Sequence, residues 1–530
     1  MLVKIFGSAI HGVEAITITI EVNVAPGIRF CLVGLPDNAV KESEFRIETV
    51  IKNIGYKMPR MRTVVNMAPA GIRKAGSAYD LPIALGIIAA SNQVAFTRSP
   101  HTYIIMGELS LDGALRPIRG VLPMAMQAKK EGFSGIILPM QNAREAAVVE
   151  SLEVFGMPHI SEVLAFLQGA ERPPEIPQPY CADFSSEVDF AEIKGQGTVK
   201  RAMEIAAAGG HNIILIGPPG AGKTMLAKRL PTILPPLSLE EALETTRIHS
   251  VAGKLGEATG IITMRPFRSP HHTMSDMAMV GGGSIPQPGE ISLAQNGVLF
   301  LDELPEYKRS VLEVLRQPME ERKVTISRAR NSADFPATFM LVAAMNPCPC
   351  GYFNHPQKSC TCMPGMVQKY LNRISGPLLD RIDLHVEVTP VNPSSLASTV
   401  QAETSEEVRK RVIAARNRQA LRFRELNKPF LPASAGSGAT SSPGAAVSTY
   451  SNAQMNAKQL HHYCRLPPEA RELLSQAMKK LQLSARAYER IIKVSRTIAD
   501  LEDSAAITPH HIAEAIQYRT LDRESWGRQF

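Results

Sequence analysis

Short apolar runs alternate with helix-like segments along the first third of the chain. These runs, rich in β-branched residues, predict four strands at 15–24, 62–67, 103–106 and 135–138. The apolar stretch from Asp80 to Ser91 predicts a helix between the second and third of them. We therefore expect a first domain of mixed strands and helices, from residue 1 to about 172.

Two further domains are predicted beyond it. The proline-rich segment at 173–188 is too polar for a core and predicts a linker. From 189 to 392 the order is strand, glycine-rich turn, helix and further buried strands, which predicts a parallel α/β sheet. Residues 393–530 read as helical, and their Ser/Ala/Gly-rich stretch at 432–450 predicts a disordered loop.

Composition narrows the class of protein. The hydrophobic fraction of 44% and charged fraction of 20% are typical of globular proteins. No window approaches the ~18 apolar residues needed to cross a bilayer, and the N-terminus lacks a signal-peptide pattern. Seven cysteines, four of them close together, do not resemble a secreted disulfide framework. We expect a cytoplasmic protein without a membrane segment, and its net charge of +8 permits a polyanionic partner without requiring one.

A phosphate-binding loop, GPPGAGKT at 217–224, follows a short apolar strand at 213–216 and leads into a helix. Its glycines let backbone N–H groups surround the β-phosphate, and the helix N-terminus adds positive charge. Lys223 is expected to reach the β- and γ-phosphates, and the Thr224 hydroxyl to ligate Mg²⁺. The predicted ATP contacts are Gly217, Pro218, Pro219, Gly220, Ala221, Gly222, Lys223, Thr224 and Met225.

Two carboxylates end the next buried strand, at 298–301. Carboxylates in this position are costly unless they face a metal or a reacting group. Asp302 is expected to hold Mg²⁺ through its water shell, and Glu303 to orient and deprotonate the attacking water. A third strand, at 339–344, is followed by Asn346, whose amide we expect between the γ-phosphate and that water.

Three arginines further along the chain are candidates for contacts with the γ-phosphate. Arg381 lies between two aspartates and is expected to reach ATP bound by a neighbouring subunit, where such a finger adds roughly 10³–10⁵ in rate. Arg373 is the alternative finger. Arg486 opens a helical segment and is expected to close a lid over ATP. A finger that acts in trans implies a ring of subunits, for which six is the expected number.

Two Cys-x-Cys pairs predict a structural zinc site, although Cys-x₂-Cys is the commoner spacing. The four thiols are those of Cys348, Cys350, Cys360 and Cys362. His355 could replace one of them. A site with four protein ligands fixes a loop and leaves no position for substrate. We therefore expect zinc removal to damage assembly or DNA binding more than nucleotide binding.

A family resemblance is carried by seven stretches: IKGQ at 193–196, AAAGGHN at 206–212, RPFRSPHHT at 265–273, NGVLFLDELPE at 296–306, VTISRAR at 324–330, AAMNPCPCG at 343–351 and ISGPLLDRIDLH at 374–385. The chain resembles the ComM/YifB group of magnesium-chelatase-like proteins over nearly its whole length. The resemblance implies an AAA+ P-loop ATPase module with a helical lid, a homo-hexamer, and nucleotide contacts from Ile193 and Gln196. It also implies DNA branch migration, a helicase activity used in natural transformation.

The resemblance also suggests where DNA would be contacted. In related rings an insertion before the Asp302 strand points into the central channel. Here that segment offers side chains that could meet a DNA backbone: Arg265, Arg268, His271 and His272. Packing on a neighbouring subunit and a zinc site at the histidines are the alternatives.

Two further basic segments have open roles. The stretch at 324–341 predicts a hairpin with Arg328 and Arg330 near its tip, which either contacts phosphates or is a plain surface hairpin. The arginine-rich helix at 408–424 is either a DNA contact or a solvated face of the lid.

The first domain resembles the proteolytic domain of Lon-type proteases and the related domain of the ATPase RadA, through the stretches at 68–85 and 107–139. This implies a Lon-protease-like (ribosomal S5 domain 2-like) α+β fold. Lon-type proteases use a Ser–Lys dyad. Here the lysine position is Leu122, and Ser77 is displaced from the serine position. We expect an inactive protease domain that serves as a scaffold or a DNA-guiding collar.

Taken together, these features predict an ATP-driven ring motor that acts on DNA, with ATP, Mg²⁺ and structural Zn²⁺ as cofactors. Its phosphate contacts are expected to be largely independent of sequence. The alternative is a magnesium-chelatase-type or protein-remodelling motor that works with partner proteins. The RadA-like domain and the cysteine cluster argue against that alternative, and the intact set of catalytic residues argues against a non-hydrolysing scaffold.

Overall fold

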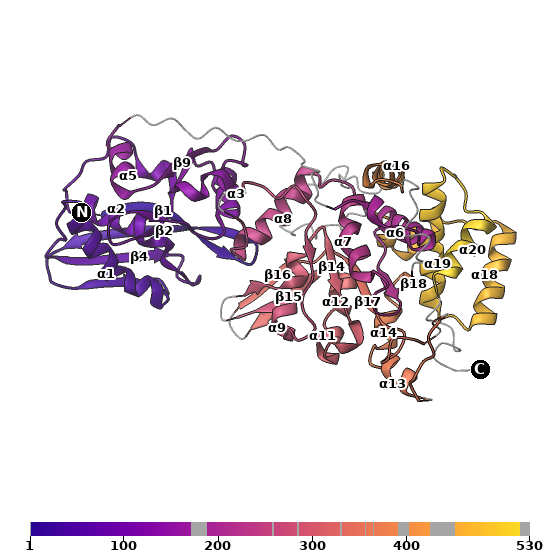
Figure 1. Ribbon diagram of the computed structural model, residues 1–530. Coiled ribbons are helices and arrows are strands. Elements are labelled where there is room, and N and C mark those ends of the chain that lie inside the picture. Colours follow the sequence, from indigo (N-terminus) through magenta and orange to yellow (C-terminus); the bar gives the residue numbers. More distant parts are fainter. Residues whose placement is uncertain are drawn as a thin grey trace.

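The computed structural model describes residues 2–170, 188–256, 259–283, 286–328, 331–353, 355, 357–363, 365–390, 402–424 and 451–519. This part of the chain is elongated, with the N-terminal domain at one end and the C-terminal helices at the other (Figure 1). The predicted loop at 432–450 lies outside the described residues, and so does the predicted linker except for Val188. No helix within the described ranges is both long and apolar enough to cross a bilayer.

A seven-stranded mixed sheet forms the N-terminal domain, in the order β3-β4-β2-β1-β5-β8-β9. The four predicted strands and the predicted helix, α2 (Asp80–Ala90), are confirmed, and α2 is buried along its whole length. The pattern did not predict β1, which pairs with β2 in a long hairpin that turns at Gly12. The strands are β1 (Leu2–His11), β2 (Glu14–Ala25), β3 (Phe30–Val33), β4 (Arg62–Ala68), β5 (Tyr103–Ile105), β8 (Gly135–Pro139) and β9 (Glu153–Met157). The other main helices are α1 (Asn38–Asn53), α3 (Val121–Glu131), α4 (Ala143–Ala146) and α5 (Ile160–Leu167).

The second domain is built on a five-stranded parallel sheet, which confirms the predicted α/β pattern. Its order is β11 (Phe267–Arg268), β14 (Val298–Leu301), β17 (Met340–Met345), β10 (Ile213–Ile216) and β18 (Leu384–Glu387). Alternate strand residues face opposite cores: Leu215 and Phe300 share one core with α6 (Gly197–Gly209) and α7 (Lys223–Ile233), and Ile214 and Leu299 belong to the other. Because both faces are covered, each strand reads as a continuous apolar run.

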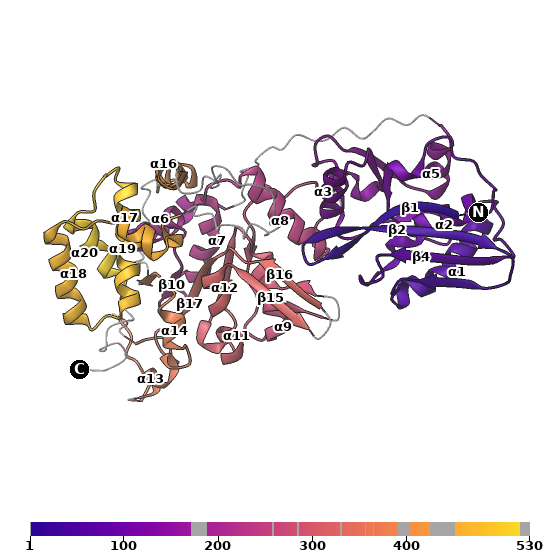
Figure 2. The ribbon, with the colours of Figure 1, turned by 180° about the vertical axis from the view of Figure 1, so that it is seen from behind.

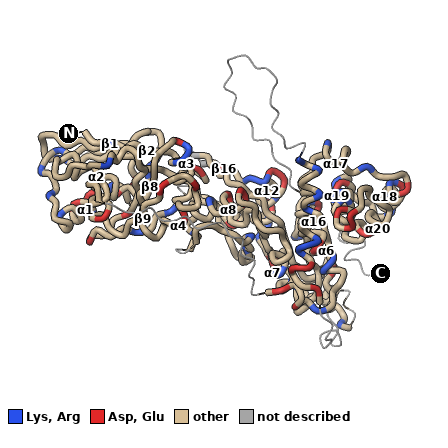
Figure 3. The backbone as a smooth tube through the Cα atoms, turned by 90° about the horizontal axis from the view of Figure 1, so that it is seen from above, with Lys and Arg blue, Asp and Glu red and all other residues tan. Residues whose placement is uncertain are grey.

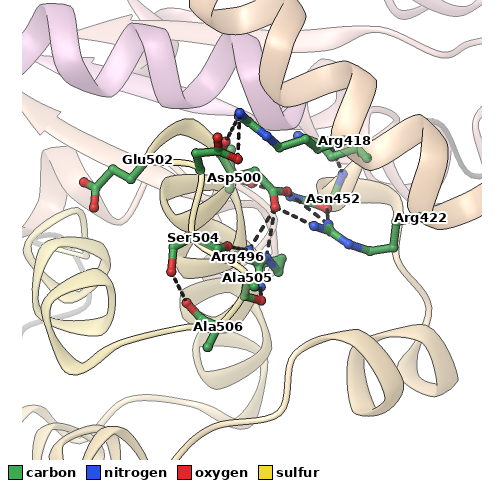
Figure 4. Close-up of polar contacts among 12 residues, drawn as sticks. Arg418, Arg422, Asn452, Arg496, Asp500, Glu502, Ser504, Ala505 and Ala506 are labelled. Atoms are coloured by element: carbon green, nitrogen blue, oxygen red, sulfur yellow. Dashed lines mark hydrogen bonds and ion pairs between the residues drawn. The ribbon is translucent and has the colours of Figure 1, made fainter.

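The C-terminal helices pack around α6 at the far end of the molecule (Figure 1). They are α16 (Ser405–Arg424), α17 (Ala457–Tyr463), α18 (Pro468–Leu481), α19 (Ala485–Leu501) and α20 (Pro509–Gln517). Several arginines of α16, for which DNA and solvent were the expected partners, instead bind groups within the chain. Arg422 and Arg496 converge on the buried carboxylate of Asp500, and Arg418 donates to the Asp500 carbonyl at 2.6 Å (Figure 4). This cluster ties α16 to α19.

Helix α8 (Leu239–Val251) of the second domain packs against α3 of the N-terminal domain, and the two helices lie side by side (Figure 2). The buried carboxylate of Glu145 accepts the N–H of Leu122, at the start of α3, at 2.7 Å. The same carboxylate accepts the hydroxyl proton of Ser250, near the end of α8. The Gly120 N–H donates to the Ser250 carbonyl at 3.2 Å. The two domains are therefore joined through buried polar contacts.

The carboxylate of Asp383 lies buried where β10, β18 and α19 meet. Arg490 of α19 pairs with it at 3.0 Å, His211 Nδ1 lies 3.4 Å away, and the Asn212 N–H donates to it at 3.0 Å. Burial alone would raise the pKa of Asp383, but Arg490 and His211 hold it well below its usual range. His211 also contacts Thr497 of α19, with 2.8 Å between Nε2 and Oγ1. This network fixes the lid helix on the sheet.

We predict that Arg490→Met lowers the free energy of unfolding by about 3–5 kcal/mol, because it leaves Asp383 charged and poorly paired in the core. The matched control is Arg486→Met on the same helix. Its ion pair with Asp380 is exposed, at 3.5 Å, and such pairs contribute at most about 1 kcal/mol. Urea unfolding followed by circular dichroism measures both variants, and equal losses would contradict the prediction.

The same network gives a pH dependence of stability. Since folding lowers the pKa of Asp383, its contribution is fully present above the ordinary carboxyl range. It is lost as the pH falls through that range toward the folded pKa. Arg490→Met should therefore cost less stability in acid than at neutral pH, which the same unfolding experiment tests.

Candidate nucleotide site

The predicted phosphate-binding loop connects β10 to the first residue of α7. The Gly217 N–H donates to the Met345 carbonyl at 3.2 Å, so the loop is anchored on β17. Gly220 and Gly222 have φ values of 79° and 84°, a region that favours glycine. The sequence placed the helix start at Met225, and the structure places it two residues earlier, at Lys223.

Lys223 points into the loop. Its Nζ donates to the carbonyls of Gly217 and Pro218 at 2.7 and 2.9 Å, and to Asn346 Oδ1 at 3.1 Å. Burial lowers the pKa of Lys223, while Asp302 and Glu303 act in the opposite direction. The ammonium group therefore lies where phosphates can replace backbone carbonyls as its partners.

The remaining catalytic candidates lie at the same edge of the sheet, because parallel strands end together. Thr224 Oγ1 donates to Asp302 Oδ2 at 2.6 Å, so the two predicted magnesium ligands are adjacent. Glu303 and Asn346 line one pocket with Asp302 and the loop residues 219–225. Oxygen ligands of this kind suit Mg²⁺ bound together with nucleotide phosphates. The structure thus brings together the predicted phosphate and magnesium residues.

Gln196, one of the two nucleotide contacts predicted from the IKGQ stretch, contacts the phosphate-binding loop. Gln196 Nε2 donates to the carbonyls of Ala221 and Thr389, both at 3.1 Å. Its Oε1 is buried and has no hydrogen-bond partner within the part of the chain that the structure describes. Ile193, the other predicted contact, lies three residues before Gln196 in the sequence and is fully buried. Gln196 therefore retains a free acceptor next to the loop.

The three candidate arginines differ in accessibility. Arg381 is only 6% exposed, and its guanidinium binds the Pro377 carbonyl and pairs with Glu320. Arg373 is about half exposed, pairs with Glu306 at 2.9 Å, and lines a pocket with Glu303. Arg486 is exposed. A contact from Arg381 to another subunit would require it to leave Glu320, whereas Arg373 is already accessible.

The four predicted cysteines come together in one cluster, and their sulfur atoms all lie within 4.8 Å of one another. Tetrahedral zinc with bonds of about 2.3 Å separates sulfurs by roughly 3.8 Å. Here the Cys348, Cys350 and Cys360 sulfurs are 3.3, 3.5 and 3.8 Å apart, so the thiols fit such a site. His355 is not part of this cluster, and its Nδ1 accepts the N–H groups of Gln357 and Lys358.

The cysteine loop touches the nucleotide site. A Cβ on Gly351 would lie 2.6 Å from Pro219 Cδ, so only glycine allows the loop to approach the phosphate-binding loop this closely. Cys348 follows Asn346 by two residues in the sequence. The cluster is therefore placed to influence the nucleotide site directly.

The arginines proposed for DNA contact in the insertion have partners within the chain. Arg265 pairs with Glu241 at 3.0 Å and donates to the carbonyls of Pro235 and Asn296. Arg268 forms two hydrogen bonds of 2.7 Å with Glu290. DNA contact by either arginine stays a prediction, and it would require these ion pairs to open.

His272 lies beside Glu303, and His271 lies beside His272. His272 Nδ1 is 3.4 Å from Glu303 Oε2, and the His271 and His272 rings are 4.1 Å apart. His271 Nδ1 contacts Thr273 Oγ1 at 2.9 Å. Sequence reasoning missed this relation to Glu303, because no local pattern around the two histidines indicates which distant residue they face.

The predicted hairpin is formed by β15 (Lys323–Arg328) and β16 (Asn331–Pro336). The Arg328 side chain and the whole of Arg330 lie outside the described residues. In the N-terminal domain, Leu122 is buried at the start of α3, and the Ser77 hydroxyl pairs with Glu108. Leu122 cannot act as a base, and the Ser77 hydroxyl is paired with Glu108, so these two positions do not form a Ser–Lys dyad.

Three family models match the chain. The model described as magnesium chelatase, subunit ChlI, matches residues 189–396. A model of subunit ChlI of Mg-chelatase matches residues 20–142, and one of the ChlI C-terminal region matches residues 402–519.

Curated proteins match over the full length. YifB of Salmonella typhimurium is 42% identical over 97% of this chain and 96% of its own length. The competence protein ComM of Haemophilus influenzae is 42% identical over 98% of each chain. Two matches are partial: Lon protease 2 of Bacillus subtilis, 27% identical over 28% of this chain and 26% of its own, and the DNA repair protein RadA of Haemophilus influenzae, 28% identical over 21% and 24%.

We predict that Lys223→Ala abolishes ATP binding, because Lys223 supplies the half-buried positive charge at the phosphate-binding loop. Glu303→Gln should retain binding and lose about 10²–10⁴-fold in turnover, since glutamine is similar in size but cannot accept the proton. Equilibrium binding of a fluorescent ATP analogue and phosphate release measure the two effects. Turnover at the wild-type rate in Glu303→Gln would contradict the assignment of Glu303.

Proposed function

Because the chain belongs to the magnesium-chelatase-like AAA+ family, in the ComM/YifB group, we propose that it is an ATP-driven ring motor that acts on DNA. The family implies ATPase activity, and the convergent nucleotide residues agree with it. In its specific form, the proposal is a branch-migration helicase that promotes integration of DNA during recombination or natural transformation.

The observation that carries this proposal is the full-length similarity to a protein named for competence. The partial similarity to a DNA repair protein supports the same class of substrate. A motor that must accept any DNA sequence needs contacts to the phosphate backbone rather than to bases.

The proposed DNA surface contains two neighbouring hairpins. The short ribbon β12 (Gly281–Gly282) and β13 (Gln287–Pro288) packs on β15, where a Cβ on Gly281 would lie 2.8 Å from Ile326 Cδ1. The β1–β2 turn reaches the other hairpin strand, with Gly12 facing Ala333. Arg328 and Arg330 are the proposed phosphate contacts, and the N-terminal Lon-like domain is proposed as an inactive collar.

A ring is proposed because no arginine is among the described residues that line the pocket around Lys223 and Asp302. Lys223 and Asn346 occupy the inner side of the pocket, and a neighbouring subunit would supply the finger. Both Arg381 and Arg373 remain candidates for it. Six subunits is the number that we propose.

Zinc is proposed at the four clustered thiols. The donor set and the sulfur separations support a closed structural site, with no position for substrate. The contact of Gly351 with Pro219 changes one expectation from the sequence: loss of zinc should weaken nucleotide binding as well as assembly or DNA binding.

The alternative function is a chelatase-type or protein-remodelling motor that works with partner proteins. It is favoured by one observation, that the matching family models describe a magnesium-chelatase subunit. A response of the ATPase to DNA separates the two functions.

We predict that single-stranded or four-way-junction DNA stimulates ATP hydrolysis, and that the stimulation weakens as salt rises because released counterions oppose binding. Steady-state phosphate release with and without each DNA, at two salt concentrations, measures it. Glu303→Gln is the control for contaminating ATPases. A rate that is indifferent to every DNA would favour the partner-protein alternative.

We also predict about one zinc ion per chain, lost in Cys360→Ser. The variant should bind ATP more weakly than wild type, because its loop no longer supports Pro219. Elemental analysis and the fluorescent ATP analogue measure metal and affinity. Cys31→Ser, in the N-terminal sheet, is the matched control and should keep both. Full zinc content in Cys360→Ser would refute the site.

A further inference from the structure

The carboxylate of Glu303 has one side-chain partner in the structure. Glu303 follows β14 and begins a short 3-10 turn with φ at 52°, and its backbone N–H donates to Asp302 Oδ1 at 2.9 Å. Its side chain is 55% exposed. Within the described ranges, only His272 pairs with the carboxylate, with 3.4 Å between Nδ1 and Oε2. Among the described side chains, His272 is therefore the one placed to orient the Glu303 carboxylate.

The position of His272 is itself fixed. The loop that carries it leaves β11, which pairs with β14 at the edge of the sheet. The Tyr307 hydroxyl donates to the Pro270 carbonyl at 2.6 Å, and the Tyr307 ring meets the His272 ring edge-on at 6.4 Å. The loop is thus bound to the segment that follows Glu303, so the imidazole and the carboxylate are held by a common support.

The geometry leaves the other carboxylate oxygen available. Glu303 lines the pocket with Lys223 and Asn346, and the contact of His272 Nδ1 is to Oε2, at 3.4 Å. A shortening of about 0.5 Å would turn the contact into a full hydrogen bond from Nδ1–H. Oε1 would then remain free to take a proton from a water at the pocket.

We propose that His272 is a positioning residue for ATP hydrolysis, which orients Glu303 toward the attacking water and does not touch the nucleotide. The inference rests on the proposed ATPase and is independent of DNA. It also links hydrolysis to the insertion, because the loop continues into α9 (Asp276–Val280) and then into β12. Displacement of this ribbon would move His272 relative to Glu303.

The test compares three variants for steady-state ATPase without DNA. His272→Phe keeps a ring beside Tyr307 but removes Nδ1, and we expect kcat to fall about 10- to 100-fold with KM nearly unchanged. His272→Asn, which keeps a donor at similar reach, should recover part of this loss. His462→Phe is the matched control, because His462 also lies edge-on to a tyrosine ring, that of Tyr463, but belongs to α17 and lines neither pocket at Glu303, and it should keep the wild-type kcat.

Two further measurements separate a loss of turnover from a loss of nucleotide binding or of assembly. Binding of the fluorescent ATP analogue and the oligomeric state by light scattering should be unchanged in His272→Phe. A wild-type kcat in His272→Phe, or an equal loss in His462→Phe, would overturn the proposal, and so would a loss of ATP affinity that accounts for the whole effect. A wild-type protein without ATPase activity would instead refute the proposed function.

Discussion

The ATPase domain depends on one buried ionic contact, between Asp383 and Arg490. A carboxylate placed in a core is costly unless it is paired and hydrogen-bonded. Here its partners come from α19, from His211, which follows α6, and from the backbone of Asn212 before β10. Asn212 extends the network, since its side chain bonds the Leu341 N–H of β17 and the Arg381 carbonyl. The contact therefore fixes both the register of three strands and the position of the lid.

The nucleotide site follows from that register. In a parallel sheet the loops after β10, β14 and β17 leave from one edge, so residues that are 123 positions apart, Lys223 and Asn346, come within 3.1 Å. The site needs few contacts of its own beyond these. Its loop is anchored on β17 through Met345, and the cysteine loop closes over Pro219 from the same strand. Asn346, the phosphate-binding loop and the cysteine cluster are thus all supported by β17.

Much of the nucleotide site and of the cysteine cluster was predictable from sequence, because their residues occur in short contiguous patterns. The phosphate-binding loop, the carboxylates after an apolar strand and the Cys-x-Cys pairs each need only their own spacing. What failed to follow from sequence was the choice of distant partners. Arg265 and the arginines of α16 look free in a linear pattern but bind groups within the chain. His272 likewise gave no local sign that it faces Glu303, and β1 was missed because its short apolar stretches resemble a loop.

The buried carboxylate of Glu145 joins the N-terminal domain to α8. Leu122, at the position where the resemblance to Lon-type proteases implies a lysine, lies at the start of α3, and α3 packs on α8. The Leu122 N–H and the Ser250 hydroxyl share the carboxylate of Glu145. Burial raises the pKa of Glu145, and hydrogen bonds from Ser250 and Leu122 oppose that rise. A carboxylate that is committed to holding two domains together cannot also serve an open catalytic site. The N-terminal domain is therefore attached to α8 through buried polar contacts at the start of α3.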